Sequence, residues 1–276
     1  YIVAVQPKRS FITDVWRGNL RVHLMYKALI ELSADRAEFL SRLFSRPRPA
    51  GLEGGASVQE LFRAYRAAQP DRELFEENLR AIMRRLTVDH GFSLHAGDDA
   101  GIAAVYSNFF AAGPALRFVS SRGGNRYPSY EDLQQATDGA GVEWSYLSTE
   151  ERFTRLRDLQ QANTIVPIVG NFAGPKALRS VGSYLKANAA TVDVFYTSNV
   201  ERYLFQDGLW GRFAANVETL PVTAASTFIR SCFDTCSGGG GSRSVSLLDS
   251  MSGLLADVSA GRVVSYDDVL NHSHGR

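Results

Sequence analysis

Apolar positions in the first half of the chain recur at helical spacing. Residues 19–44 carry an apolar residue at every third or fourth position, which predicts one long helix. Ser57 followed by Glu60 forms a capping-box pattern that opens a helix to about residue 68. A further helix is predicted over residues 72–86, so this half is mainly helical.

Strand and helix patterns alternate from the middle of the chain. The predicted strands are 10–15, 118–121, 142–147, 164–169 and 191–197, and the predicted helices are 129–137, 149–161 and 176–186. This alternation indicates βαβ units and a parallel sheet. We therefore expect an α/β fold with a Rossmann-like, mostly parallel sheet flanked by helices. Residues 1–276 form a single domain in this interpretation, with 47–125 as a helical and loop insertion or cap.

The last fifty residues give a mixed pattern. Residues 226–233 and 262–266 are predicted strands, and residues 245–258 are predicted to form a helix. A glycine-rich loop lies between them at residues 237–242. Residues 101–110 fit a helix or a strand equally well.

Composition narrows the range of partners. Thirty basic and twenty-nine acidic residues give a net charge of +1, so no global field attracts nucleic acid or an anionic membrane. No apolar run in the sequence is close to the length of a membrane-spanning helix, which is about 20 residues. Two cysteines are too few for a disulfide framework and lack zinc-site spacing. We expect a cytoplasmic protein with a small-molecule partner and no metal. The sequence does not indicate an oligomeric state.

Polar residues that follow predicted strands are the candidate site. In open parallel sheets, ligands bind outside the carboxyl ends of the strands. Asp14 ends the first such strand, the turn 170–175 follows the strand 164–169, and the turn 198–201 follows the strand 191–197. We expect these three segments to lie along one edge of the sheet.

Each candidate has a ligand-binding and a purely structural interpretation. Asp14 can accept hydrogen bonds from a ribose diol, or serve as a favourable charge at the start of the next helix. Asn19 and His23 share one face of that helix, beside Arg17. A lone histidine on a helix is more often structural than catalytic.

The turn 170–175 is the most informative segment. Gly170 permits a special backbone angle or close approach of a ligand, Asn171 can hydrogen-bond a polar group, and Phe172 can stack on a ring. The alternative is a tight strand-to-helix turn without a ligand. In the next turn, Asn199 and Glu201 can face the same crevice, or Ser198 or Asn199 can cap a helix with Glu201 in its first turn.

Four segments resemble a poorly characterised bacterial family described as methyltransferase-like. They are residues 11–19 (FITDVWRGN), 23–29 (HLMYKAL), 165–175 (IVPIVGNFAGP) and 195–201 (FYTSNVE). The resemblance covers about residues 1–205 and implies a Rossmann-like methyltransferase that uses S-adenosylmethionine. In that family a strand and a glycine-rich loop precede the segment that matches Tyr1, so the resemblance also implies these two elements upstream of Tyr1.

The resemblance assigns roles by position. It implies Asp14, Arg17, Asn19, Gly170 and Gly174 in cofactor binding, Asn171, Phe172 and His23 at the methyl-transfer site, and Ser198, Asn199 and Glu201 toward the substrate. The chain departs from such enzymes, since it lacks the glycine-rich motif and the Asn/Asp-Pro-Pro-Tyr/Phe motif. A non-catalytic ligand-binding or scaffold module, or another nucleotide-dependent enzyme such as a dehydrogenase, therefore stays open.

Overall fold

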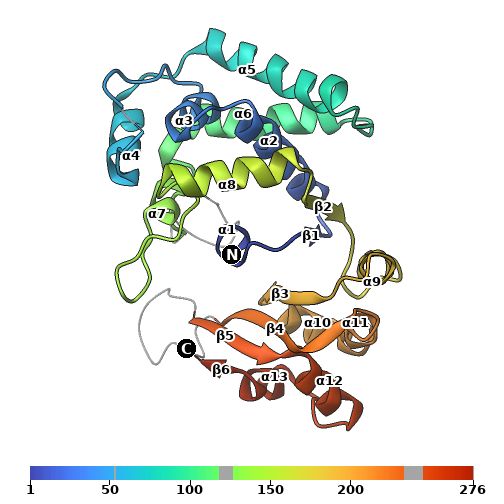
Figure 1. The fold of residues 1–276 in the computed structure, drawn as a ribbon. Coiled ribbons are helices and arrows are strands. Elements are labelled where there is room, and N and C mark those ends of the chain that lie inside the picture. Colours follow the sequence, from blue (N-terminus) through green and yellow to red (C-terminus); the bar gives the residue numbers. More distant parts are fainter. Residues whose placement is uncertain (53, 118–126, 233–244, 276) are drawn as a thin grey trace. The chain divides into compact units, whose positions relative to one another are not determined.

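The protein is described by a computed structural model that covers residues 1–52, 54–117, 127–232 and 245–275. It is an α/β protein, rich in helix, with small and partly parallel sheets. The chain forms two compact units (Figure 1). Unit 1 comprises residues 1–12 and 16–167, and unit 2 comprises residues 13–15 and 168–276. The single-domain interpretation, with 47–125 as an insertion or cap, stays a prediction.

Unit 1 is mainly helical. Its helices are α1 (Ile2–Val5), α2 (Arg17–Glu31), α3 (Arg36–Phe44), α4 (Val58–Ala67), α5 (Arg72–Arg84), α6 (Asp98–Ala112), α7 (Tyr130–Gln134) and α8 (Glu150–Gln161). A π-helical turn, Arg85–Asp89, continues α5. Residues 101–110, which fit helix or strand by pattern, lie within α6.

The predicted single helix over residues 19–44 is wrong, because the chain breaks between α2 and α3. Asp35 takes an extended backbone conformation, and its side chain accepts a hydrogen bond from the Glu38 amide. The Ser33 hydroxyl donates to the Leu29 carbonyl at the end of α2. These polar groups satisfy helix ends that an apolar periodicity does not reveal.

Capping is predicted well where its residues are local. Ser57 and Glu60 form the expected capping box at α4, and Thr149 caps α8. The predicted strand 142–147 is wrong. The Asp138 carboxylate accepts hydrogen bonds from two backbone amides and from the Trp144 indole, which folds this segment into turns.

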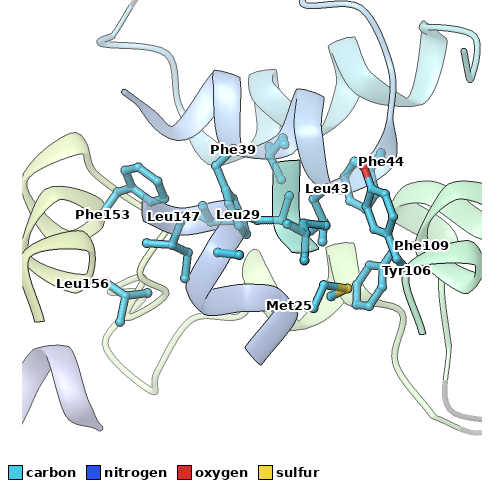
Figure 2. Packing of buried hydrophobic residues seen from close by; sticks show 14 of the residues in the cluster. Met25, Leu29, Phe39, Leu43, Phe44, Tyr106, Phe109, Leu147, Phe153 and Leu156 are labelled. Carbon is cyan, nitrogen blue, oxygen red and sulfur yellow. The ribbon is translucent and has the colours of Figure 1, made fainter. Parts of the chain in front are cut away.

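The core of unit 1 is built from several helices. Figure 2 shows Leu29 and Phe39 among the side chains of this core. Phe39 is fully buried, and its ring lies 5.5 Å from Phe153 and 6.1 Å from Tyr146, centroid to centroid. Tyr106, also fully buried, stacks on Phe75 at 4.8 Å, and burial raises the pKa of its hydroxyl to about 12. Helices α4, α5 and α6 thus share one apolar core with α2 and α3.

Two short strands, β1 (Ser10–Asp14) and β2 (Ile165–Val169), pair with each other. Each begins in unit 1 and ends in unit 2. In unit 1 the Ser10 amide donates to the Thr164 carbonyl, and in unit 2 the Gly170 amide donates to the Asp14 carbonyl. The two strands therefore run in parallel, as their sequences predict.

Unit 2 contains a four-stranded sheet in the order β3 (Val192–Ser198), β4 (Val222–Cys232), β5 (Val245–Ser250), β6 (His274–Gly275). The β3–β4 pair is parallel, and the other two pairs are antiparallel. The helices of this unit are α9 (Ala177–Ala187), α10 (Val200–Gln206), α11 (Trp210–Val217), α12 (Met251–Ser259) and α13 (Tyr266–His272).

Two predictions in the tail are wrong. Residues 245–258 are strand β5 followed by α12, because β5 pairs with β4 and Ser250 then accepts a hydrogen bond from the Gly253 amide as N-cap. Residues 262–266 are not a strand, since Ser265 and Asp268 form a capping box that opens α13. The predicted strand 118–121 and the glycine-rich loop 237–242 lie outside the described residues.

In the part of the chain that the structure describes, none of the helices combines the length and apolar character needed to cross a bilayer. Among the same residues, no group of three or more His, Cys, Asp or Glu side chains is placed to bind a metal ion. Cys232, at the end of β4, is disulfide-bonded. The expected cytoplasmic location stays a prediction.

Candidate functional site

The ends of β1 and β2 bring two of the predicted site residues together within unit 2. The Gly170 amide donates to the Asp14 carbonyl at 2.8 Å. A Cβ built on Gly170 would lie 3.8 Å from the Thr13 methyl group. The strand-end rule therefore places the backbone of Asp14 beside the turn 170–175, as the sequence predicts.

Close packing explains why Gly170 is a glycine. A Cβ at this position would lie only 2.4 Å from the Cβ of Ala177, the first residue of α9. At Gly174, a Cβ would come within 3.1 Å of the Asn171 carbonyl oxygen. Both glycines are thus accounted for by a tight turn from strand to helix, the structural alternative that the sequence left open.

The fold also uses Asn171 and Phe172. The Asn171 side-chain oxygen accepts a hydrogen bond from the Ala173 amide at 2.8 Å, within the turn itself. The Phe172 ring lies edge-on to Phe195 of β3 at 5.5 Å and tilted against Phe213 of α11 at 6.1 Å. These contacts fix the turn against the sheet and helix of unit 2.

Asn216 of α11 is a residue that sequence reasoning missed. It is buried, and its side-chain amide donates to the carbonyls of Phe172 at 2.7 Å and Gly174 at 2.8 Å. Its side-chain oxygen accepts from Arg179 Nε at 2.8 Å. Because its partners lie about forty positions away, no local spacing could have identified Asn216.

An open pocket of about 400 Å³ lies against this same turn. Its lining comes from the turn and from helices α9 and α11: Ala173, Gly174, Pro175, Arg179, Arg212, Ala215 and Asn216. The predicted turn thus borders a pocket, but the residues that face it from the helices were not among the predicted ones.

The turn after β3 uses its polar residues differently. Ser198 has a left-handed backbone with φ of +54°, and Asn199 occupies the N-cap position of α10 without a capping side-chain hydrogen bond. Glu201 is fully buried. Its two oxygens accept from Arg230 Nε at 2.6 Å and Nη2 at 3.1 Å. Glu201 therefore joins α10 to β4 inside the unit.

Arg230 is the centre of a buried charge network, which we call the Arg230 network: Glu201, Arg230, Asp249, His272 and Ser273. Arg230 Nη1 donates to Asp249 at 2.6 Å and to the Ser273 hydroxyl at 2.9 Å. His272 Nδ1 lies 2.5 Å from Asp249. His272 is the last residue of α13, so this network joins α13 to β4 and β5.

The remaining predicted residues lie on α2 in unit 1. Arg17 donates to Asp98 of α6 through Nε at 2.8 Å and Nη2 at 2.5 Å, and Arg21 Nε donates to the same carboxylate at 3.1 Å. The hydrogen bonds from Arg17 hold the pKa of Asp98 far below its ordinary value. Asn19 and His23 are half-buried on the same helix. Arg17 therefore joins α2 to α6.

Comparison with known families adds one assignment. Residues 1–239 match a family described as a domain of unknown function, DUF7790. The chain belongs to this family. No curated protein matches the chain. The DUF7790 match spans all of unit 1 and extends through β4, so it includes Asp14, the turn 170–175, Glu201 and Arg230, while Asp249 and His272 lie beyond it. The description of this family states no activity, so the resemblance to methyltransferases stays a hypothesis.

The ion pairs of Asp98 with Arg17 and Arg21 predict that the stability of this DUF7790 chain depends on pH. Because the pKa of Asp98 is lowered in the folded state, its ion pairs stabilise the fold above the ordinary carboxyl pKa of about 3.9, and this contribution falls as the pH drops below that value. Asp98→Asn should lower the unfolding midpoint at pH 7. The difference from the unaltered protein should shrink below about pH 4.

Thermal unfolding followed by circular dichroism between pH 3 and 7 tests this expectation. Asp99→Asn is the matched control, because Asp99 is exposed in the same helical turn. If the unfolding midpoints of Asp98→Asn and the unaltered protein differ by the same amount at every pH, the ion pairs of Asp98 are not the origin of this stability.

Proposed function

We propose that the chain binds a small nucleoside-type ligand at the edge of unit 2 where β1 and β2 end, with S-adenosylmethionine as the first candidate. The observation that carries the proposal is the hydrogen bond between Gly170 and Asp14, which joins an acidic strand end to a glycine-containing turn. In Rossmann-like folds, this combination at the carboxyl ends of parallel strands serves the ribose and its attached groups. The finer Rossmann-like assignment is part of this proposal.

Methyl transfer is the reaction that the sequence resemblance implies. It depends chiefly on aligning the acceptor with the methyl group, so it needs few acid–base residues. Under this proposal Asp14 holds the ribose, Asn171 and Phe172 border the transferred group, and the acceptor is a small molecule. Neither nucleic acid nor a membrane is a proposed partner.

A second candidate is ligand binding without catalysis. Three residues assigned to transfer or substrate contact already serve the fold: Asn171 in its own turn, Phe172 between aromatic rings, and Glu201 in a buried ion pair. A module that binds a nucleoside but transfers nothing requires no further role for them.

Titration with S-adenosylmethionine, S-adenosylhomocysteine and NAD is the test. A ligand that binds only the folded state adds about 2.7 kcal/mol of stability at a hundred times its Kd. Because a hydrogen bond to a charged group contributes about 1.5–3 kcal/mol, Asp14→Asn should weaken S-adenosylmethionine binding at least about tenfold. Asp193→Asn, an exposed acid on β3, should leave binding unchanged.

The outcomes separate the candidates. Binding of S-adenosylmethionine together with turnover of small acceptors supports the methyltransferase, and binding with no transfer supports the non-catalytic module. Binding of NAD alone would point to another nucleotide-dependent enzyme. If none of the three ligands stabilises the protein, the nucleoside proposal is wrong.

A further inference from the structure

The pocket beside Gly174 is lined by charge of one sign. Arg179 of α9 and Arg212 of α11 are the charged side chains in its lining, and no carboxylate belongs to it. The remaining lining residues are small or neutral. The positive charge at this pocket is therefore not balanced by an acidic neighbour in the wall itself.

Neither arginine is neutralised elsewhere in the described parts of the chain. Arg17, Arg36 and Arg230 all lie within 2.8 Å of a carboxylate oxygen. Among the described residues, no such ion pair involves Arg179 or Arg212, and Arg179 contacts the neutral side chain of Asn216 instead. Both guanidinium groups thus keep their charge available to solvent or to a ligand.

Arg179 is also held in a defined orientation. Its Nε donates to Asn216, and the Asn216 amide is itself fixed by the Phe172 and Gly174 carbonyls. Since the guanidinium is planar, fixing Nε leaves the two Nη groups to present their N–H donors elsewhere. Such a fork matches the spacing of two oxygens on a carboxylate or phosphate, and pre-orientation reduces the entropy lost on binding.

We propose that this pocket binds a small anion through a phosphate or carboxylate group, with Arg179 and Arg212 as the contacts and Asn216 as the residue that positions Arg179. The site does not require the nucleoside ligand proposed above, because its contacts lie on α9 and α11 and not on β1.

The test titrates the full chain with inorganic phosphate, adenosine monophosphate and succinate at low ionic strength, following the arginine Nε–H resonances by NMR. Low salt is needed because exposed charges are screened over about 10 Å at 0.1 M salt. We expect saturable shifts of the Arg179 signal. Arg212→Ala should weaken binding about tenfold or more, while Arg212→Lys should retain part of it.

Arg202→Ala is the control, because Arg202 is an exposed arginine on α10 that does not line the pocket. Tight binding of phosphate and adenosine monophosphate with weak succinate binding identifies a phosphate ligand, and the reverse order identifies a carboxylate ligand. Absence of saturable binding by all three anions, or binding that Arg212→Ala leaves unchanged, overturns the proposal. Asp14→Asn should not alter phosphate affinity, so this site and the nucleoside site can fail separately.

Discussion

Replacing Arg230 by methionine is expected to destabilise unit 2 by about 3–5 kcal/mol. The substitution leaves the Glu201 and Asp249 carboxylates without their shared cation, although both remain almost completely buried. Asp249 keeps its contact with His272 Nδ1 at 2.5 Å, but Glu201 loses its ion-pair partner, and a desolvated charge without a partner is among the most costly features a fold can contain. Domains are commonly stable by only about 5–15 kcal/mol, so this loss is a large part of the free energy of unfolding. Much of unit 2 should therefore already be unfolded at moderate temperature.

Urea unfolding followed by circular dichroism and by tryptophan fluorescence measures this loss. Arg202→Met, on the exposed side of α10, is the matched control and should change stability by less than about 0.5 kcal/mol. Replacing all of Glu201, Arg230 and Asp249 by apolar residues of similar size should recover much of the stability, because no orphan charge remains. A triple variant as unstable as Arg230→Met would show that packing, and not charge, causes the loss.

Phe39→Ala is expected to destabilise unit 1 by about 3–5 kcal/mol. The ring is fully buried and lies against Tyr26, Tyr146 and Phe153, so its removal leaves a cavity that three aromatic neighbours from different parts of the chain must line (Figure 2 shows the surrounding core). Because aromatic rings are rigid, the cavity should collapse only in part.

Val88→Ala is the control for this prediction, since Val88 is 67% exposed and removal of its methyl groups should change stability by less than about 0.5 kcal/mol. Phe39→Leu, which keeps more of the buried volume, should cost less than Phe39→Ala. Equal unfolding midpoints for Phe39→Ala and Val88→Ala would refute the role of Phe39 in the core.

The sequence predicts the elements whose signals are local. The strands β1, β2 and β3 follow from short β-branched runs, and the helix α4 follows from Ser57 and Glu60 within one turn. Periodicity fails where two elements follow one another closely and the polar residues between them also fit a continuous helix. Apolar positions lie on both sides of the cap residue Ser250, and the pairing of β5 with β4 distinguishes the strand from the helix α12.

The candidate site shows the same division. The approach of Gly170 to Asp14 could be predicted, because a general rule places the ends of neighbouring parallel strands together. The Arg230 network could not, since its ion pairs join positions 29 and 19 residues apart, with no repeating spacing. Arg179 and Arg212 resemble any exposed helical arginines until the fold places both beside one turn.

The early position of Thr13, Asp14 and Val15 has a consequence for biosynthesis. These three residues belong to unit 2 but leave the ribosome before almost all of unit 1, whereas Gly170, the partner of Asp14, is made much later. Unit 1 can therefore fold during translation, while unit 2 must wait for its remaining segments. A fragment that starts at Ile168 would lack β1, and the Gly170 amide would lose its Asp14 acceptor. Unit 1 can thus fold before unit 2, but a single cut of the chain cannot separate the two units.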